Sequence, residues 1–157
     1  MKATLSVLVK NHAGVLSKVS GMFSRRGYNI QSLAVGETHD PTISCMTIVV
    51  DGDQRTLQQI EKQLNKVIPV IKVKRLPDST SISRVLTLFK VSFPLSRREE
   101  LLKTAELMGA KIVDAGKSTV TLELTDTAER TAVMEQLLVS YGLKEVVRTG
   151  TVAIEKG

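Results

Sequence analysis

The sequence is poor in the residues on which metal sites, disulfides and base stacking depend. Its 157 residues include one cysteine, two histidines, two tyrosines, three phenylalanines and no tryptophan. One cysteine cannot form an internal disulfide, and with two histidines it leaves a metal cage improbable. So few aromatic side chains offer no platform for stacked bases, which argues against nucleic-acid binding in its commonest form.

Long apolar runs are also missing. No segment approaches the ~20 consecutive apolar residues that a bilayer span requires. Residues 1–5 lead directly into alternating strand sequence, so neither a signal peptide nor a transit peptide is indicated. With 42% hydrophobic and 24% charged residues, the composition is that of a folded globular chain. A cytoplasmic protein with no membrane partner is therefore expected.

The charge is unevenly distributed along the chain. The net charge of +6 falls entirely within residues 1–76, whereas residues 77–157 carry equal numbers of acidic and basic side chains. A basic half indicates an anionic partner, such as nucleic acid, an acidic protein or an anionic metabolite. For Lys72, Lys74 and Arg75, two interpretations remain open: they dock to a partner protein, or they are simply solvated side chains of a strand.

Hydrophobic periodicity divides the chain into two copies of one pattern, strand–helix–strand–strand–helix–strand. The first copy has expected strands at 4–10, 29–36, 43–50 and 70–76, and helices at 15–26 and 57–67. The second has expected strands at 84–93, 110–114, 118–125 and 143–154, and helices at 96–108 and 128–141. Ser96 and Glu99 have the spacing of a capping box.

This order predicts an α+β fold of two tandem ferredoxin-like βαββαβ units with antiparallel sheets. We expect one domain at 1–76, a polar linker at 77–82 and a second domain at 83–157. The strand at 43–50 is apolar on both faces, and the helices of a two-layer unit cover only one. The other domain or another chain could cover the second face, or a few aliphatic side chains could stay exposed; a homodimer is the preferred interpretation.

No convincing catalytic site is visible. His12 and His39 fall in predicted turns, and Cys45 lies within a predicted strand, where a small core residue is the commoner role. A nucleophile needs a base beside it, and no such pair is evident. No phosphate-binding glycine motif is present either. An enzyme on this fold is therefore disfavoured.

The loop at 11–14 is a better candidate for binding a small molecule. It precedes the first helix, where unpaired N–H groups and the helix dipole favour a carboxylate. Gly14 allows a ligand to approach the main chain, and the Asn11 amide can hold an ammonium group. An aliphatic pocket is expected from Val15, Leu16, Ile30, Leu33 and Val35. On the residues alone, the simpler alternative stays open that Asn11 caps the helix and Gly14 merely turns the chain.

Two long segments carry a resemblance to a known family. Residues 5–17 and 23–33, which include the run FSRRGYNIQSL, closely resemble the N-terminus of the small, regulatory subunits of acetohydroxyacid synthase (acetolactate synthase). Shorter matches to that family are residues 47–50, 59–66, 110–114 and 144–150. Residues 78–82 and 94–107 match less well. The resemblance thus covers nearly the whole chain.

The resemblance implies an N-terminal ACT domain that binds valine at a homodimer interface and inhibits a catalytic large subunit, which the chain also activates. It implies an effector site made by Asn11, Gly14, Val15 and Leu16 of one protomer and by Asn29 and Ile30 of the other. The chain itself is then non-catalytic and holds no cofactor, whereas thiamine diphosphate, FAD and magnesium belong to the large subunit. The alternative is a free-standing ACT-type amino-acid sensor acting on another enzyme or on transcription, although no helix-turn-helix is evident.

Overall fold

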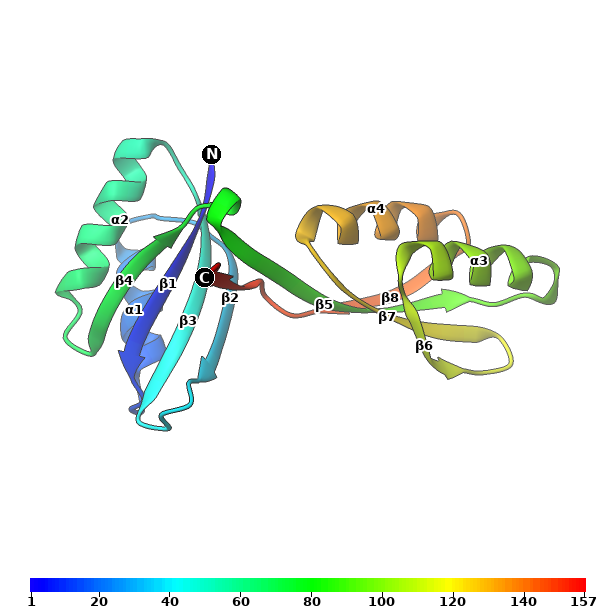
Figure 1. Ribbon diagram of the computed structural model, residues 1–157, viewed down its shortest axis with the longest axis horizontal. Helices are drawn as coiled ribbons and strands as arrows, with labels where there is room; N and C mark the ends of the chain where they lie inside the picture. The colour runs from blue at the N-terminus through cyan, green and yellow to red at the C-terminus, as the bar shows by residue number, and fades with distance from the viewer. The chain divides into compact units, whose positions relative to one another are not determined.

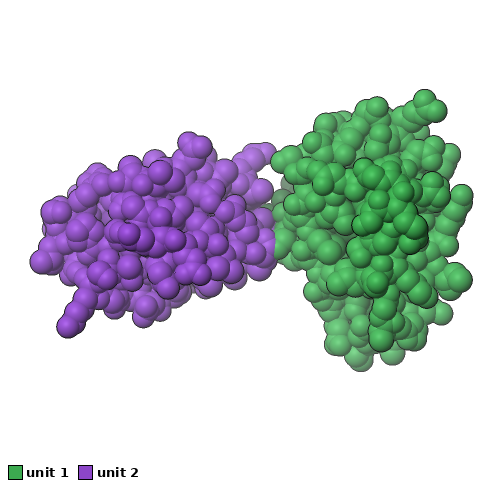
Figure 2. All heavy atoms as spheres, turned by 180° about the vertical axis from the view of Figure 1, so that it is seen from behind, with its two compact units in different colours: residues 1–83, 150–157 green, residues 84–149 purple.

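The computed structural model describes residues 1–157 as two compact units (Figures 1 and 2). Unit 1 comprises residues 1–83 and 150–157, and unit 2 comprises residues 84–149. Each unit has its own antiparallel sheet, its own pair of helices and its own hydrophobic core. The predicted α+β fold of two βαββαβ units is confirmed.

Unit 1 is a four-stranded sheet with two helices packed on one face (Figure 1). Its elements are β1 (Lys2–Lys10), α1 (Val15–Arg25), β2 (Ile30–Glu37), β3 (Ile43–Asp51), α2 (Gln54–Lys66) and β4 (Val70–Leu76). The strand order is β2-β3-β1-β4. Alternate residues of β1 and β3 face the helices, so Leu5, Val7, Met46 and Ile48 are buried in the core with Phe23 of α1.

The ends of the helices follow local sequence signals. Asp53 precedes α2, and its carboxylate accepts a 2.7 Å hydrogen bond from the backbone N–H of Thr56. That bond with the Thr56 N–H lowers the pKa of Asp53. Gly109 follows α3 (Arg98–Met108) with a φ of 80°, a left-handed conformation that glycine adopts without steric cost.

Unit 2 repeats the arrangement of unit 1. Its elements are the greater part of β5 (Ser81–Ser92), a 3₁₀ turn η2 (Leu95–Arg97), α3, β6 (Lys111–Ala115), β7 (Thr119–Asp126), α4 (Ala128–Val139) and β8 (Leu143–Arg148). The strand order is β6-β7-β5-β8. Phe89, Leu122 and Met134 are fully buried at the centre of its core.

The capping box predicted at the start of the second unit's first helix is wrong. Ser96 lies within the 3₁₀ turn η2, which follows Pro94, and α3 begins only at Arg98. The residue before α3 is Arg97, whose side chain makes no capping hydrogen bond. The 3₁₀ turn therefore moves the helix start past the predicted serine.

The C-terminal residues belong to unit 1 and not to unit 2. Strand β9 (Val152–Glu155) pairs with β5, and the Lys156 N–H donates to the carbonyl of Thr80 at 2.8 Å. The expected linker at 77–82 forms a 3₁₀ turn, η1 (Asp78–Thr80), and the start of β5. The compact units thus divide the chain differently from the expected domains 1–76 and 83–157, because the β5–β9 pair holds the chain end beside the first sheet.

The second face of the unit 1 sheet is partly covered by this C-terminal segment. Strand β9 contacts β1 and β4, and Lys74 of β4 forms an ion pair with Glu155. On β3 the residues of that face include Cys45 and Val49, both of intermediate exposure, and Thr47, which is buried. The chain's own end therefore covers this face beside β1 and β4.

Candidate functional site

The loop between β1 and α1 is fixed at both of its sides by backbone hydrogen bonds. The N–H of Lys10 donates to the carbonyl of Pro69 at 2.9 Å, and the N–H of Asn11 donates to the carbonyl of Thr42 at 2.8 Å. These bonds tie the loop to the turn before β4 and to the turn between β2 and β3. The loop is therefore exposed but held in place.

The Asn11 side chain does not cap the helix. Its Nδ2 donates to the Glu37 carboxylate at 3.2 Å and to the carbonyl of Pro41 at 3.0 Å. Both amide hydrogens are thus committed, and the amide oxygen is left as an acceptor. The simpler alternative, in which Asn11 caps α1, is wrong. An amide oxygen with a carboxylate nearby suits the ammonium group of an amino acid.

The start of α1 presents N–H groups without an acceptor in the chain. Gly14 occupies the capping position with a φ of 84°, and no side chain caps the helix. The N–H of Val15 donates to the carbonyl of His12 at 3.4 Å, and the first bond within the helix is from Lys18 to Gly14. The N–H groups of Leu16 and Ser17 lie between these two donors and have no partner. No acidic residue lies in the first turn, so this helix start favours a carboxylate.

Gly14 has open space around it as well as an unusual backbone conformation. A Cβ added at Gly14 would meet no atom within 4 Å. The loop therefore has room for a ligand beside the main chain. The left-handed φ independently disfavours other residues at this position.

The hairpin turn that accepts the Asn11 amide is itself held by Asp40. The Asp40 carboxylate accepts from the Thr42 hydroxyl at 2.7 Å and from the Thr42 N–H at 3.0 Å. These two bonds, the side-chain bond first, lower the pKa of Asp40 below its ordinary value. An ionised Asp40 thus keeps the carbonyl of Pro41 in position for Asn11.

The structure does not bring all six predicted effector residues together in one chain. Ile30 pairs with Val50, which pairs with Ala3 of β1, whereas Glu37, the partner of Asn11, lies at the other end of β2. From Ala3 to Asn11 along β1 is more than 20 Å at the usual rise of ~3.3 Å per residue. Asn29 and Ile30 therefore lie at the opposite end of the sheet from Asn11 and Gly14. A site that uses both sets of residues requires two copies of the chain.

The side chains of the predicted pocket differ in their access to solvent. Val15 is 5% exposed and belongs to the core, so it can offer a ligand only its backbone. Leu16 is 46% exposed and Val35 is 47% exposed. Ile30 and Leu33 are partly buried against the core. Leu16 and Val35 therefore provide accessible apolar surface, and Ile30 and Leu33 can provide some.

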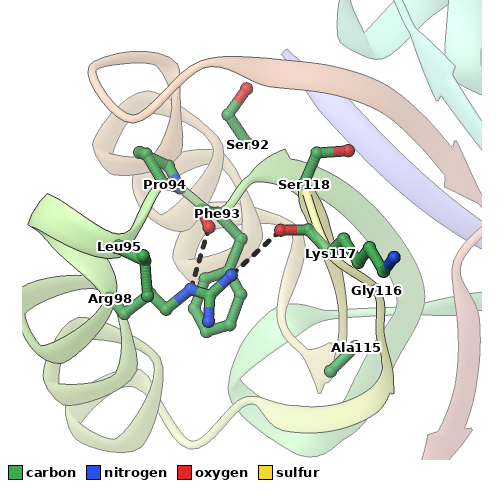
Figure 3. Close-up of a pocket in the computed structure, with 9 residues that line it drawn as sticks. All are labelled: Ser92, Phe93, Pro94, Leu95, Arg98, Ala115, Gly116, Lys117 and Ser118. Carbon is green, nitrogen blue, oxygen red and sulfur yellow. Dashed lines mark hydrogen bonds between the residues drawn. The ribbon is translucent and has the colours of Figure 1, made fainter.

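Unit 2 has an equivalent loop, and it is built differently (Figure 3). The N–H of Ser92 donates to Gly142 at 2.9 Å and that of Phe93 donates to Ser118 at 2.8 Å, which repeats the two anchors of the first loop. A hollow of about 940 Å³ lies beside it. Arg98 crosses this hollow, and its guanidinium donates to the carbonyls of Phe93 at 3.0 Å and Lys117 at 2.9 Å.

The second loop is less suited to an anionic ligand than the first. Arg98 uses two of its donors to join the loop to the β6–β7 turn and lies 4.5 Å from the Phe93 ring. The first turn of α3 carries Glu99 and Glu100, whose charges oppose an anion at the helix start. The Asn11 loop of unit 1 is therefore better suited to a small anionic ligand than the corresponding loop of unit 2.

The remaining chemistry of the chain is sparse. No group of three or more His, Cys, Asp or Glu side chains is placed to hold a metal ion. Cys45 is a free thiol of intermediate exposure, 3.5 Å from the Ser6 hydroxyl. None of the helices has the length and apolar character needed to span a membrane.

These features define a class of protein, a chain of two tandem ferredoxin-like units. Residues 5–72 match the family described as the ACT domain of acetohydroxyacid synthase small subunit-like proteins, and residues 84–157 match the family described as the small subunit of acetolactate synthase. The chain belongs to the family of acetolactate synthase small subunits.

Relatives and a solved structure agree with this assignment over the full length. The chain is 43% identical over 157 residues to a probable acetolactate synthase small subunit of Archaeoglobus fulgidus, covering 100% of this chain and 98% of the relative. It is 44% identical over 154 residues to the acetolactate synthase small subunit of Mycolicibacterium smegmatis, covering 98% and 91%. The crystal structure of the small subunit from Thermotoga maritima superposes with a TM-score of 0.93 at 34% identity, covering 100% of this chain and 98% of that one. The predicted family is confirmed.

Proposed function

We propose that this chain is a non-catalytic subunit that binds valine between two copies of itself and thereby inhibits a catalytic large subunit of acetolactate synthase. In the absence of valine, it activates that subunit. Thiamine diphosphate, FAD and magnesium are expected on the large subunit, and the complex is expected in the cytoplasm. The small-subunit names of the relatives support the existence of a large partner.

The observation that carries the proposal is the separation of the two half-sites along one sheet. Asn11 and Gly14 lie at one end, and Asn29 and Ile30 lie at the other. In a two-fold dimer, one end of each sheet can lie against the opposite end of the partner's sheet. Asn11 and Gly14 of one protomer then meet the segment of the other protomer that contains Asn29 and Ile30. Such a dimer contains two identical sites, and a ligand in either site contacts both chains.

The chemistry of the Asn11 loop supports an amino-acid ligand. The free N–H groups at the start of α1 suit a carboxylate, and the Asn11 oxygen and Glu37 suit an ammonium group. Leu16, 46% exposed, offers apolar surface to a short aliphatic side chain. The identity of the amino acid as valine rests on the resemblance of residues 5–17 and 23–33 to the family.

Reconstitution with a large subunit tests the function. The chain is mixed with a thiamine-dependent acetolactate synthase from the same source, and copurification and turnover are measured with and without valine. We expect a complex that is more active than the large subunit alone and that loses activity when valine is added. A chain that neither copurifies with the synthase nor alters its turnover contradicts the proposal and favours a free-standing sensor. Turnover by the isolated chain would support an enzyme.

A further inference from the structure

The C-terminal segment meets β2 at one tight junction within unit 1. The N–H of Thr151 donates to the Ser32 hydroxyl at 2.8 Å. Gly150 lies so close to β2 that an added Cβ would overlap the carbonyl oxygen of Leu33 and lie 2.5 Å from its carbonyl carbon and 3.1 Å from the Ala34 nitrogen. No side chain can be accommodated there without moving backbone, so Gly150 is required by close approach and not by a turn.

The junction is next to an irregularity in β2. Ile30 pairs with Val50 and Ser32 pairs with Val49, so Gln31 is an extra residue that bulges out of the ladder. A bulge of this kind changes the direction in which the preceding residues point. Gly150 and Thr151 contact β2 just after the bulge and therefore limit how the segment Asn29–Gln31 can be placed.

Thr149, the residue before the junction, is firmly held within unit 2. Its N–H donates to the Leu86 carbonyl at 3.0 Å, its hydroxyl accepts from the Leu86 N–H at 3.1 Å, and the same hydroxyl approaches the Leu86 carbonyl at 3.5 Å. Gly150 is the next residue and is held in unit 1. Thr149 of unit 2 is therefore followed directly by Gly150 of unit 1, which is held against β2.

We propose that the Gly150 junction positions the start of β2 for ligand binding. It fixes the segment before Ser32, which supplies Asn29 and Ile30 to the ligand. This role rests on the proposed binding of valine at Asn29 and Ile30. A loosened junction lets β2 leave the arrangement that the ligand binds best, and the apparent affinity for the ligand then falls. Gly150 and Ser32 are positioning residues, because neither is placed in contact with the ligand.

Two variants of the full chain test this positioning role, each with a matched control. Gly150→Ala introduces the overlap with Leu33, and Ser32→Ala removes the acceptor of Thr151 with little change in volume. Gly157→Ala is the glycine control because nothing lies within 4 Å of its added Cβ. Ser24→Ala, at an exposed position of α1, is the serine control.

Amide hydrogen exchange and calorimetric titration with valine provide the readouts. We expect faster exchange of the β2 amides in both test variants, and a dissociation constant for valine raised about threefold to tenfold in Ser32→Ala and at least about tenfold in Gly150→Ala. In the wild type, valine is expected to slow exchange of the β2 amides, and this response is expected to be weaker in both test variants. The two controls are expected to match the wild type.

The outcomes separate the positioning role from the function on which it rests. If the wild type binds valine, but both test variants keep wild-type β2 exchange and affinity, the positioning role is overturned. The same holds if β2 exchange becomes faster but the affinity for valine stays at the wild-type value. If the wild type does not bind valine, the proposed function and the positioning role in valine binding both fail. Faster β2 exchange in the variants would then show only that the junction holds β2 in place.

Discussion

At the scale of single residues, Gly14 has both a left-handed backbone conformation and open space around it, and different substitutions test these two properties. Its φ of 84° favours glycine, and its surroundings are open. Asparagine tolerates left-handed backbone better than most residues and is isosteric with aspartate. A comparison of the two substitutions therefore distinguishes added charge from added bulk and strain.

We predict that Gly14→Asp abolishes inhibition by valine while activation of the large subunit is retained. The new carboxylate would stand against the ligand carboxylate at the start of α1 and fill the open space beside the loop. Dose–response curves of the reconstituted enzyme measure both properties. Gly14→Asn, without the charge, is expected to weaken inhibition less. Retained inhibition of Gly14→Asp at moderate valine concentrations would refute the assignment of the site.

Asn29 is exposed and lies in the loop before β2, with no hydrogen bond from its side chain within the chain. We predict that Asn29→Ala weakens valine binding and leaves the free energy of unfolding almost unchanged, because no contact inside the chain is lost. Calorimetry and denaturant unfolding measure the two quantities. Asn65→Ala, on the exposed side of α2, is the control and is expected to bind valine normally. An unaltered affinity in Asn29→Ala counts against the shared pocket.

At the scale of elements, the turn between β2 and β3 links the protonation of Asp40 to the loop that contains Asn11. The bonds from the Thr42 hydroxyl and the Thr42 N–H lower the pKa of Asp40 from its ordinary value of 3.8. The pKa of Asp40 is thus lower in the folded than in the unfolded chain, so ionised Asp40 stabilises the folded state above pH 3.8. This stabilisation is lost as the pH falls from there through the folded-state pKa.

We predict that Asp40→Asn removes this part of the acid sensitivity. The free energy of unfolding of the wild type should fall more steeply than that of Asp40→Asn as the pH drops below 3.8. Urea unfolding at a series of pH values measures the difference. Asp114→Asn, at an exposed position of β6, serves as control and should follow the wild type. Parallel curves for the wild type and Asp40→Asn contradict the role of this carboxylate.

Helices and strands could be predicted from the sequence where the pattern that indicates them lies within a short segment. The alternation of β1 and the apolar stripes of the helices reflect contacts with neighbours in the same unit, and the structure has a strand or helix at each expected place. The predicted capping box failed because Pro94 is followed by a 3₁₀ turn, which takes up Ser96 before α3 begins. The bonds from Asn11 to Glu37 and Pro41 join residues 26 and 30 positions apart, so no local pattern indicates them.

At the scale of the whole molecule, the main question is whether two chains share each proposed effector site. One chain places Asn11 and Asn29 at opposite ends of its sheet, so a variant of either residue should damage a different proposed half-site. A dimer made of one chain of each kind contains one site with both defects and one site with neither.

We predict that valine binding is partly restored when Asn11→Ala and Asn29→Ala chains are coexpressed with different tags. Each mixed two-fold dimer has one intact site out of two, so the purified doubly tagged dimer is expected to bind about half as much valine as the wild-type dimer. Calorimetry of the doubly tagged dimer measures the recovery, and each variant expressed alone is the control. A mixed dimer that binds no better than the single variants indicates that each site is built from one chain.

The sequence by itself determined the two repeats, the type of each element and the family, because all three are encoded in the order and spacing of residues along the chain. It also indicated a ligand at residues 11–14, since a glycine-containing turn before a helix exposes N–H groups wherever it occurs. Only the tertiary structure decided that Asn11 holds the β2–β3 turn instead of capping α1, that residues 150–157 return to the first sheet, and that the two predicted half-sites lie apart in one chain. These features depend on which distant segments meet, and hydrogen-bonded register and backbone packing settle that without leaving a local pattern in the sequence.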